Sequence, residues 1–426
     1  MKKKKICIIG LGYVGLPIAI EFSKYYEVIG FDIAEDRIKK LSRYYDANNQ
    51  FTKNELKKIK KLKFSNNEKD IKNSNIYIIT VPTPINKNFK PDLTLLINAT
   101  KLVSKYIDKG NYVIYESTVY PGCVESKCIP ILEKKKKLSL NKDFFCGYSP
   151  ERINPGDKKN TLTNIKKIVS GSNSKALEFI YKLYKKIIRA GVHKVSNLKT
   201  AEAAKIIENV QRDLNIALIN ELSLIFNKMK IDTEEVLEAA STKWNFHRYK
   251  PGLVGGHCIG VDPYYLTEAA KHFQYNPKLI LAGRKLNNSM PSKVTDILIN
   301  FLKHKYKKEK IRKLRILVLG FAFKENCPDI RNSKISDLYY NLKKQFKKVN
   351  IYDPEVSREE VQKTYNIKLD KSLKKNSADV LILAVPHNSL IKVSKKIISL
   401  NKRILFFDLK SVYKKSFSQI RLWALI

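Results

Sequence analysis

A glycine-rich turn between two short apolar segments limits the possible folds of this chain more than any other feature. The segment KKICIIG runs into G-L-G-Y-V-G, and the next apolar segment, EVIGFD, ends at Asp32, twenty residues beyond Gly12. In a strand–turn–helix unit that binds dinucleotides, the first glycine permits the tight turn. The second lets the backbone approach the pyrophosphate, and the third packs the helix on the strand. We assign these roles to Gly10, Gly12 and Gly15, and expect Asp32 to bind the ribose hydroxyls of NAD rather than NADP.

The same N-terminal residues also resemble the start of a secretory signal, because four lysines precede an apolar run. A signal peptide ends at a small-residue cleavage site, whereas this run continues into Glu21 and a second predicted strand. The run is also shorter than the ~18 residues that a membrane span needs. We therefore expect a cofactor-binding turn in a cytoplasmic protein that has no membrane partner.

The net charge of +42 could indicate nucleic acid, an anionic membrane surface or an acidic small substrate. The lysines are scattered in runs, and no nucleic-acid-binding motif is visible, so solvated lysine-rich faces are the favoured interpretation. A basic nucleic-acid-binding protein on a Rossmann scaffold stays open as an alternative, which salt-dependent binding would reveal. The six cysteines form no C-x-x-C pair and no zinc-ligand spacing, so we expect no metal site and a reducing compartment.

A chain of 426 residues is too long for one ordinary core, so two or three domains are expected. Residues 199–230 have apolar side chains near a 3.6-residue period, which predicts one long helix. After it, RILVLG, VNIYDPE, ADVLILAVP and RILFFDLKSVY repeat the apolar segments of the first 120 residues in the same order. This repeat predicts a second nucleotide-type sheet. Because GFAFK replaces the glycine-rich turn, Phe323 and Lys324 are expected to hold a different nucleotide.

The segment 244–266 has the densest set of residues that could carry chemistry. Cys258 follows a Gly-Gly pair, and Asp262 lies four residues further on. A thiol at a loop-to-helix junction among basic residues can act as a nucleophile, although a lone cysteine is more often a small buried apolar residue. His257 is interpreted as structural or as a residue that supports the site indirectly, because adjacent residues of an extended segment point in opposite directions.

Seven motifs occur in an order that resembles one known family. They are GLGYVGLP, VPTP, ESTVYPG, GYSPERINPG, KIIEN, GLVGGHCIGVDP and GFAFKENCPDIRNS. From residue 1 to about 415 the chain is similar to the UDP-glucose/GDP-mannose dehydrogenase family of nucleotide-sugar 6-dehydrogenases. It looks most like the branch that oxidises UDP-N-acetylglucosamine or its galacto epimer for capsule and O-antigen polysaccharides. UDP-glucose, GDP-mannose and UDP-N-acetylmannosamine stay open as alternative substrates.

The resemblance implies an α/β fold with two Rossmann-like, doubly wound parallel-sheet domains joined by a long-helix central domain. The expected domains are 1–195 for NAD, 196–300 for the catalytic cysteine and the dimerisation helix, and 301–426 for the UDP-sugar. The implied reaction is a four-electron oxidation of the sugar C6 hydroxyl by two NAD+, through a thiohemiacetal and a thioester on Cys258. A homodimer is the implied assembly.

The resemblance also assigns roles to individual residues. In catalysis, Lys205 and Asn209 would bind the oxyanion at C6, Asp262 would order a water, and Glu151 would assist thioester hydrolysis. The implied cofactor-binding residues are Gly10, Gly12, Tyr13, Val14, Gly15, Asp32, Arg37, Thr83, Thr118 and Arg331. The implied substrate-binding residues are Arg152, Asn154, Arg212, Tyr249, Lys250, Gly255, Phe323, Lys324 and Lys410. Lys250 and Lys410 stand where relatives carry arginine, and lysine offers a point charge instead of a bidentate fork.

Overall fold

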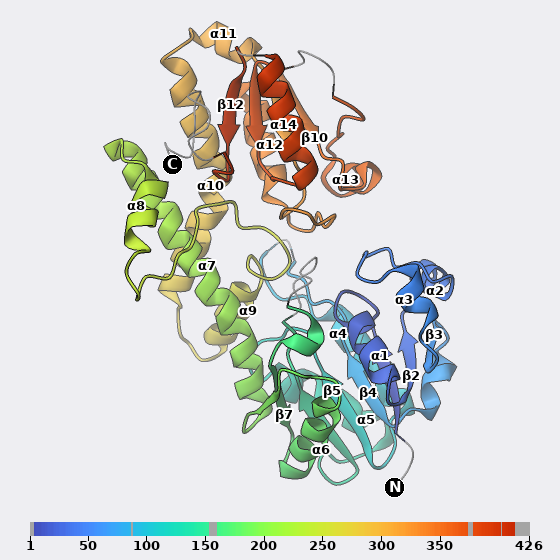
Figure 1. The fold of residues 1–426 in the computed structure, drawn as a ribbon. Coiled ribbons are helices and arrows are strands. Elements are labelled where there is room, and N and C mark those ends of the chain that lie inside the picture. Colours follow the sequence, from blue (N-terminus) through green and yellow to red (C-terminus); the bar gives the residue numbers. More distant parts are fainter. Residues whose placement is uncertain (1–3, 87, 153–159, 374–377, 402, 414–426) are drawn as a thin grey trace. The chain divides into compact units, whose positions relative to one another are not determined.

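The computed structural model describes residues 4–86, 88–152, 160–373, 378–401 and 403–413, and Figure 1 shows them as a ribbon. The chain divides into two compact units. The first unit comprises Met1–Glu208 and Tyr264–Asn276, and the second comprises Asn209–Pro263 and Pro277–Ile426. Two helices, α7 (Leu198–Met229) and α9 (Asp262–His272), begin in one unit and end in the other.

The first unit is built on a sheet with the strand order β3-β2-β1-β4-β5-β6-β7-β8. Its strands are β1 (Lys5–Ile9), β2 (Glu27–Phe31), β3 (Leu62–Ser65), β4 (Ile76–Ile79), β5 (Asn111–Tyr115), β6 (Phe144–Tyr148), β7 (Lys167–Gly171) and β8 (Val192–Lys194). Every neighbouring pair is parallel except β6 and β7, which are antiparallel. The predicted α/β class with a parallel sheet is therefore confirmed.

Helices connect these strands, as parallel pairing requires. They are α1 (Gly15–Ser23), α2 (Glu35–Ser42), α3 (Lys53–Lys57), α4 (Thr94–Tyr106), α5 (Ile129–Lys136) and α6 (Ser174–Lys185). The described ranges of this unit also contain three helical turns of other types, which are η1 (Glu68–Asn73), η2 (Val124–Cys128) and η3 (Leu162–Asn164). Within the described ranges, no helix is long and apolar enough to cross a membrane.

One predicted strand is shorter than its apolar pattern indicates. The apolar segment NIYIITVPTP covers residues 75–84, whereas β4 ends at Ile79. The backbone N–H of Thr80 still donates to Ile9. Pro82 and Pro84 then have no N–H to donate to a ladder, so the rest of the motif forms a loop at the carboxyl end of the strand.

The second unit contains a four-stranded parallel sheet with the order β10-β9-β11-β12. Its strands are β9 (Arg315–Leu319), β10 (Lys348–Tyr352), β11 (Val380–Leu383) and β12 (Leu405–Asp408). Its helices are α8 (Thr233–Ala240), α10 (Lys278–Lys303), α11 (Lys308–Lys313), α12 (Lys334–Gln345), α13 (Arg358–Tyr365) and α14 (Asn388–Leu400). This strand order matches β2-β1-β4-β5 of the first sheet, so the predicted repeat of four strands is confirmed.

Both faces of the second sheet are buried, and β9 shows why its sequence is a continuous apolar run. Ile316 and Val318 pack into one core cluster with residues of α10 and α12, whereas Leu317 and Leu319 pack into a second cluster with residues of α14. Successive side chains of a strand point to opposite faces, so a strand covered on both sides needs apolar residues at every position.

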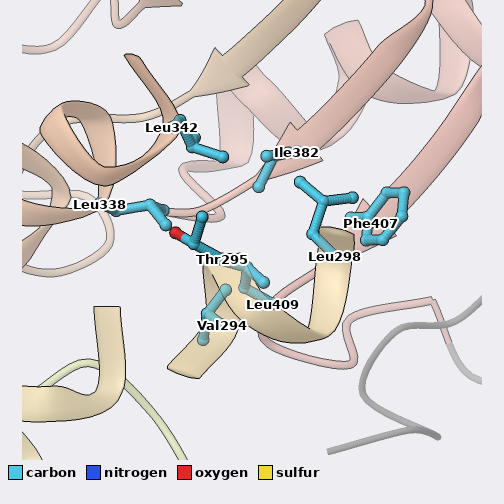
Figure 2. Close-up of a pocket in the computed structure, with 8 residues that line it drawn as sticks. All are labelled: Val294, Thr295, Leu298, Leu338, Leu342, Ile382, Phe407 and Leu409. Atoms are coloured by element: carbon cyan, nitrogen blue, oxygen red, sulfur yellow. The ribbon is translucent and has the colours of Figure 1, made fainter. Parts of the chain in front are cut away.

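A small cavity lies in this core between α10, α12 and the sheet, as Figure 2 shows. Its lining residues are Val294, Thr295, Leu298, Leu338, Leu342, Ile382, Phe407 and Leu409. The cavity measures about 10 Å³, which is near the smallest volume that holds one water. The hydroxyl of Thr295 donates to the carbonyl of Pro291. We interpret the space as a packing gap rather than a ligand site.

Candidate active site

The glycine-rich turn between β1 and α1 has the geometry that its three glycines require. Gly10 has φ +94°, which favours a residue without a Cβ. A Cβ on Gly15 would lie 1.8 Å from the carbonyl oxygen of Gly10, so the helix can approach the strand only at a glycine. A Cβ on Gly12 would meet no heavy atom within 4 Å. The turn is therefore closed on the side of the sheet and open at Gly12, where a pyrophosphate fits.

Asp32, at the carboxyl end of β2, is held by the same turn. Its Oδ2 accepts the N–H of Leu11 at 2.8 Å, and its Oδ1 accepts the N–H of Ala34 at 2.9 Å. Each carboxylate oxygen has a second lone pair, which suits it to accept a ribose hydroxyl. Arg37 donates to the carbonyl of Leu11 at 3.0 Å and pairs with buried Asp46 at 2.7 Å. Its guanidinium therefore supports the turn.

The other predicted cofactor residues of the first unit lie around the carboxyl ends of the parallel strands. Val14 is the N-cap residue of α1, and the carbonyl of Tyr13 accepts a hydrogen bond from Gln50 at 3.1 Å. The hydroxyl of Thr83, after β4, donates to the carbonyl of Thr118, after β5, at 2.6 Å. These two loops are thereby joined at the edge where doubly wound sheets bind ligands.

Tyr265 of α9 belongs to this edge but was not predicted. Its hydroxyl lies 2.9 Å from the carbonyl oxygen of Thr83 and 3.1 Å from that of Pro84, and its side chain is fully buried. The pair of tyrosines in VDPYYL, directly after the cysteine motif, is the sequence signal that could have drawn attention to it.

Glu151 follows β6 and is buried, with 6% of its surface exposed. Its Oε2 accepts from the ammonium of Lys167 at 2.7 Å, and its Oε1 accepts from the N–H of Arg152 at 2.6 Å. Arg152 forms an ion pair with Glu208 of α7 and lies 3.4 Å from the carbonyl oxygen of Lys205. Asn154, the other residue predicted in this segment, lies outside the described residues.

Lys205 and Asn209 lie one turn apart on α7, as the long-helix prediction required. Lys205 is 6% exposed, and its ammonium makes no hydrogen bond or ion pair with the described residues of the first unit. Arg212, one turn further along, is exposed.

In the second unit, Asn209 and Asp262 form a buried pair next to the cysteine. The amide of Asn209 donates to Asp262 Oδ2 at 2.5 Å, and these residues are 5% and 1% exposed. The carbonyl of Cys258 accepts the N–H of Asp262 at 2.8 Å, so the turn that carries the thiol leads directly into α9. Cys258 is half-buried, whereas the other five cysteines are buried, and all six are free thiols.

The cysteine turn is fastened to the segment after β9. The N–H of Gly256 donates to the carbonyl of Asn332 at 3.3 Å, and the Asn332 amide donates to the carbonyl of Gly256 at 3.1 Å. A Cβ on Gly255 would lie 2.6 Å from the carbonyl oxygen of Asn332. The predicted residue Gly255 is therefore needed for close backbone approach, and Asn332 is a residue that the sequence interpretation missed.

His257 points toward the same segment. Its ring packs edge to face on Phe323, with centroids 5.8 Å apart, and its Nδ1 lies 3.6 Å from Asp329 Oδ2. The carboxylate of Asp329 also holds the guanidinium of Arg331, with the closest nitrogen at 2.5 Å. Burial opposes ionisation of Asp329, but the hydrogen bonds from Arg331 outweigh it and lower the pKa of this carboxyl.

The carboxyl ends of the second sheet form a basic pocket. It is lined by Leu253, Ala322, Phe323, Lys324, Glu325, Lys334, Ile335, Ala384, Val385 and Lys410. Burial lowers the pKa of Lys410, and its nitrogen would lie 2.9 Å from a Cβ on Gly252. Lys250, near the pocket, is 3.4 Å from Glu234, and Tyr249 is half-buried. The predicted residues Phe323, Lys324 and Lys410 thus share one site that suits a diphosphate.

Family models match nearly the whole chain. The NAD binding domain of the UDP-glucose/GDP-mannose dehydrogenase family matches residues 4–188, its central domain matches 199–289, and its UDP binding domain matches 317–415. The chain belongs to the UDP-glucose/GDP-mannose dehydrogenase family. It is an NAD-dependent dehydrogenase whose substrate is a small molecule.

The dehydrogenase has full-length relatives. It is 51% identical to UDP-N-acetyl-D-glucosamine 6-dehydrogenase of Salmonella typhi, over 98% of each chain. It is 48% identical to the enzyme of the same name from Pseudomonas aeruginosa, over 99% of this chain and 100% of the relative. The solved structure of UDP-D-ManNAc dehydrogenase from Pyrococcus horikoshii has a TM-score of 0.89 and 32% identity, over 99% of both chains.

The residues of this dehydrogenase that lie around Gly12 fit NAD. The open backbone at Gly12 leaves room for the two phosphates, and the amide donors at the start of α1 complement their charge. Asp32 presents its carboxylate where a 2′-phosphate would be repelled. The enzyme's cofactor is NAD.

Proposed function

We propose that this chain oxidises the C6 hydroxyl of UDP-N-acetyl-D-glucosamine, or of its galacto epimer, to the carboxylate. Two NAD+ are consumed, and no aldehyde is released. The sugar assignment is supported by the names of the relatives at 51% and 48% identity, compared with 32% for the mannosamine enzyme. UDP-N-acetylmannosamine, UDP-glucose and GDP-mannose are the alternative substrates.

The observation that carries the proposal is the turn that combines a half-buried thiol with a buried acid–amide pair. Asp262 accepts from Asn209 at 2.5 Å, while its backbone N–H donates to the carbonyl of Cys258 at 2.8 Å. A nucleophile, a fixed carboxylate and an amide donor are the groups that covalent oxidation of an alcohol requires.

The second oxidation at C6 requires a nucleophile, which the Cys258 thiol supplies. Bound NAD+ would supply the hydride acceptor for two successive oxidations at C6. The alcohol first loses a hydride and a proton and becomes an aldehyde, which has no second hydride to lose until a nucleophile adds. Addition of the Cys258 sulfur to C6 gives a thiohemiacetal, and loss of a second hydride and proton gives a thioester. Water then cleaves the carbon–sulfur bond, which yields the acid and the free thiol.

We assign the roles of the other site residues from their charge and hydrogen-bonding groups. Lys205 and Asn209 stabilise the oxygen on C6 as negative charge develops, because an ammonium and an amide both donate hydrogen bonds to it. Asp262 orders a water, and Glu151 accepts a proton from the water that attacks the thioester. Phe323, Lys324 and Lys410 hold the uridine diphosphate, and the cofactor residues of the first unit hold NAD.

We also propose the three-domain division at 1–195, 196–300 and 301–426, and a homodimer. Support for the dimer comes from α7, where Leu218, Ile225 and Met229 expose 54%, 45% and 59% of their surface on one face. A stripe of exposed apolar residues on a long helix is typical of an interface. The six free thiols support a reducing cytoplasm, and the product would supply a surface polysaccharide such as a capsule.

The experiment measures NADH formed from each of the five nucleotide sugars, with a hydrazine present to trap aldehyde. We expect two NADH per UDP-N-acetylglucosamine and no trapped aldehyde. Cys258→Ser should abolish turnover while NAD binding persists, and Cys128→Ala, in η2, serves as the matched control. A fully active Cys258→Ser variant, or one NADH per sugar with trapped aldehyde, would overturn the proposal.

A further inference from the structure

A buried lysine lies beneath the carboxylate of Glu151, and the mechanism above does not use it. Lys167 is the first residue of β7, and its side chain is 2% exposed. Its ammonium donates to Glu151 Oε2 at 2.7 Å, to Glu116 Oε2 at 2.7 Å and to the carbonyl of Pro150 at 3.2 Å. Three acceptors match the three N–H bonds of an ammonium, so the position of Lys167 is fully determined.

The topology explains how these groups meet. Glu116 follows β5, and Glu151 follows β6, so both lie at the carboxyl ends of parallel strands. β7 is antiparallel to β6, so its first residue lies at that same edge. The reversed strand thus brings a cation 51 residues distant from Glu116 to the edge of the sheet where ligands bind.

Lys167, Glu116 and Glu151 form a charged cluster, and Tyr184 makes further contacts with its members Glu116 and Lys167. Glu116 is fully buried in side chain, and its Oε1 accepts a short hydrogen bond from Tyr184 of α6. The ammonium of Lys167 also lies 5.3 Å from the centre of the Tyr184 ring. The groups that face Lys167 are therefore Glu116 from the loop after β5, the Pro150 carbonyl and Glu151 from the loop after β6, and Tyr184 from α6.

Stability alone does not account for such a cluster. Removing an ammonium and two carboxylates from water costs several kcal/mol for each ion, and well-packed apolar residues in the same space are often as stable or more stable. With both carboxylates ionised the trio has a net charge of −1. Burial raises the pKa of Glu116 to about 7, and the two carboxylates keep Lys167 charged, since they raise its pKa against the effect of burial.

We propose that Lys167 is a positioning residue for thioester hydrolysis. It fixes the carboxylate of Glu151 in the orientation that accepts a proton from the attacking water, and Glu116 holds Lys167 from the opposite side. This inference rests on the role proposed above for Glu151. One oxygen of Glu151 is bound to Lys167 and the other to the N–H of Arg152, so the carboxylate has little freedom to rotate.

The test follows the covalent intermediate in Lys167→Met by rapid mixing and by intact mass. Both hydrides leave before hydrolysis, so we expect a burst of about two NADH per active site at the wild-type rate. Steady-state turnover should then fall about 100-fold, the lower end of what acid–base catalysis contributes, with KM nearly unchanged. The mass of the stalled enzyme should rise by an acyl group on Cys258. Lys166→Met, at the exposed neighbouring residue, should behave as wild type.

A merely structural role gives a different result, namely a smaller burst, slower hydride transfer and no acyl adduct. That outcome, or unchanged turnover in Lys167→Met, would overturn the proposal. If Lys167→Met does not fold, the double variant Glu116→Gln/Lys167→Met removes one charge of each sign and leaves the buried net charge at −1. It should show the same burst and the same adduct.

Glu151→Gln separates this inference from the function on which it rests. If Glu151→Gln accumulates the adduct and the Lys167 variants do not, the inference on Lys167 fails while the role of Glu151 stands. If none of these variants accumulates an adduct on Cys258, the proposed function itself fails.

Discussion

The Nε2 of His387 lies 3.2 Å from Oδ2 of Asp353 in the interior of the second unit, and neither side chain is exposed. The His387 Nδ1 accepts the N–H of Asn326, so Nε2 is the nitrogen that donates to the carboxylate. Asp353 follows β10 as Asp32 follows β2, and its Oδ2 also accepts the N–H groups of Phe321 and Ala322. Oδ2 of Asp353 is therefore saturated by protein donors, and its Oδ1 accepts the N–H of Glu355 at 2.9 Å.

This saturation predicts that the enzyme binds one NAD per chain. In the second sheet, Oδ2 of Asp353 already accepts from three protein donors, whereas Asp32 accepts one backbone N–H on each oxygen. Isothermal titration with NAD should give a stoichiometry of one, unchanged in Asp353→Asn. Two sites of similar affinity would contradict this interpretation.

Two glycine substitutions should separate folding from cofactor binding. Gly12→Ala places its Cβ in open space, so we expect the melting temperature to stay the same while NAD affinity falls at least tenfold. Gly15→Ala brings its Cβ to 1.8 Å from the carbonyl of Gly10, so the turn itself must shift and the melting temperature must fall. Thermal melts and NAD titrations check both, and a Gly12→Ala variant with wild-type affinity would refute the assignment.

Removing the side chain of Asn332 should slow the chemistry without harming the fold. Asn332 has φ +51°, so Asn332→Gly keeps the backbone and deletes only the amide that binds Gly256. One lost hydrogen bond of about 1 kcal/mol corresponds to a loss of roughly fivefold in kcat and in the alkylation rate of Cys258.

The control is Asn366→Gly at the end of α13. Asn366 has φ +53°, and its side-chain oxygen accepts a hydrogen bond from Gln362 of the same helix. This control should leave kcat and alkylation unchanged. If Asn332→Gly and Asn366→Gly change kcat and alkylation equally, the hydrogen bond that anchors the cysteine turn does not affect the reaction.

Glu202 gives the enzyme a pH-dependent stability. Burial raises its pKa from 4.5 to about 7, although it accepts the N–H groups of Gly122 and Val124. Between pH 4.5 and 7 the folded state therefore binds a proton that the unfolded state lacks. The unfolding free energy should fall as pH rises through this window, by at most about 1.4 kcal/mol per pH unit from this group.

Urea unfolding from pH 5 to 8 tests this slope. Glu202→Gln should flatten it, whereas Glu221→Gln, at an exposed position of α7, should leave it as in wild type. A Glu202→Gln variant with the wild-type slope would assign the pH dependence to other groups.

Truncation beside the cavity of Figure 2 should destabilise the second unit. Leu298 is 2% exposed and packs against the sheet, so Leu298→Ala should cost about 2–5 kcal/mol of unfolding free energy. Leu279→Ala on the same helix, where 73% of the side chain is exposed, should cost less than about 0.5 kcal/mol. Denaturant titration measures both, and a cost below 1 kcal/mol at Leu298 would show that the core closes around the gap.

The sequence predicted the parts of the fold that depend on residues close together in the chain. The apolar runs, the turn from Gly10 to Gly15 and the long helix depend on neighbouring residues, so their positions are close to those observed. The strand order of the second sheet could also be predicted, because its four segments repeat those of the first.

Contacts between distant segments could not be read in the same way. The ion pairs of Lys167 depend on the antiparallel direction of β7, which no local sequence pattern predicts. Glu116, one partner of Lys167, is 51 residues away in the chain. Asn332 lies inside a motif that was noticed, but its hydrogen bonds to Gly256 span 76 residues. Motifs therefore located the candidate site, whereas the groups that support it became visible only in three dimensions.

The uneven burial of the six thiols has a practical consequence. Five are enclosed in cores, and Cys258 alone is half-buried. A maleimide dye applied to the native enzyme should therefore label a single position without prior removal of the other cysteines. Its fluorescence would report ligand occupancy beside the sulfur in real time.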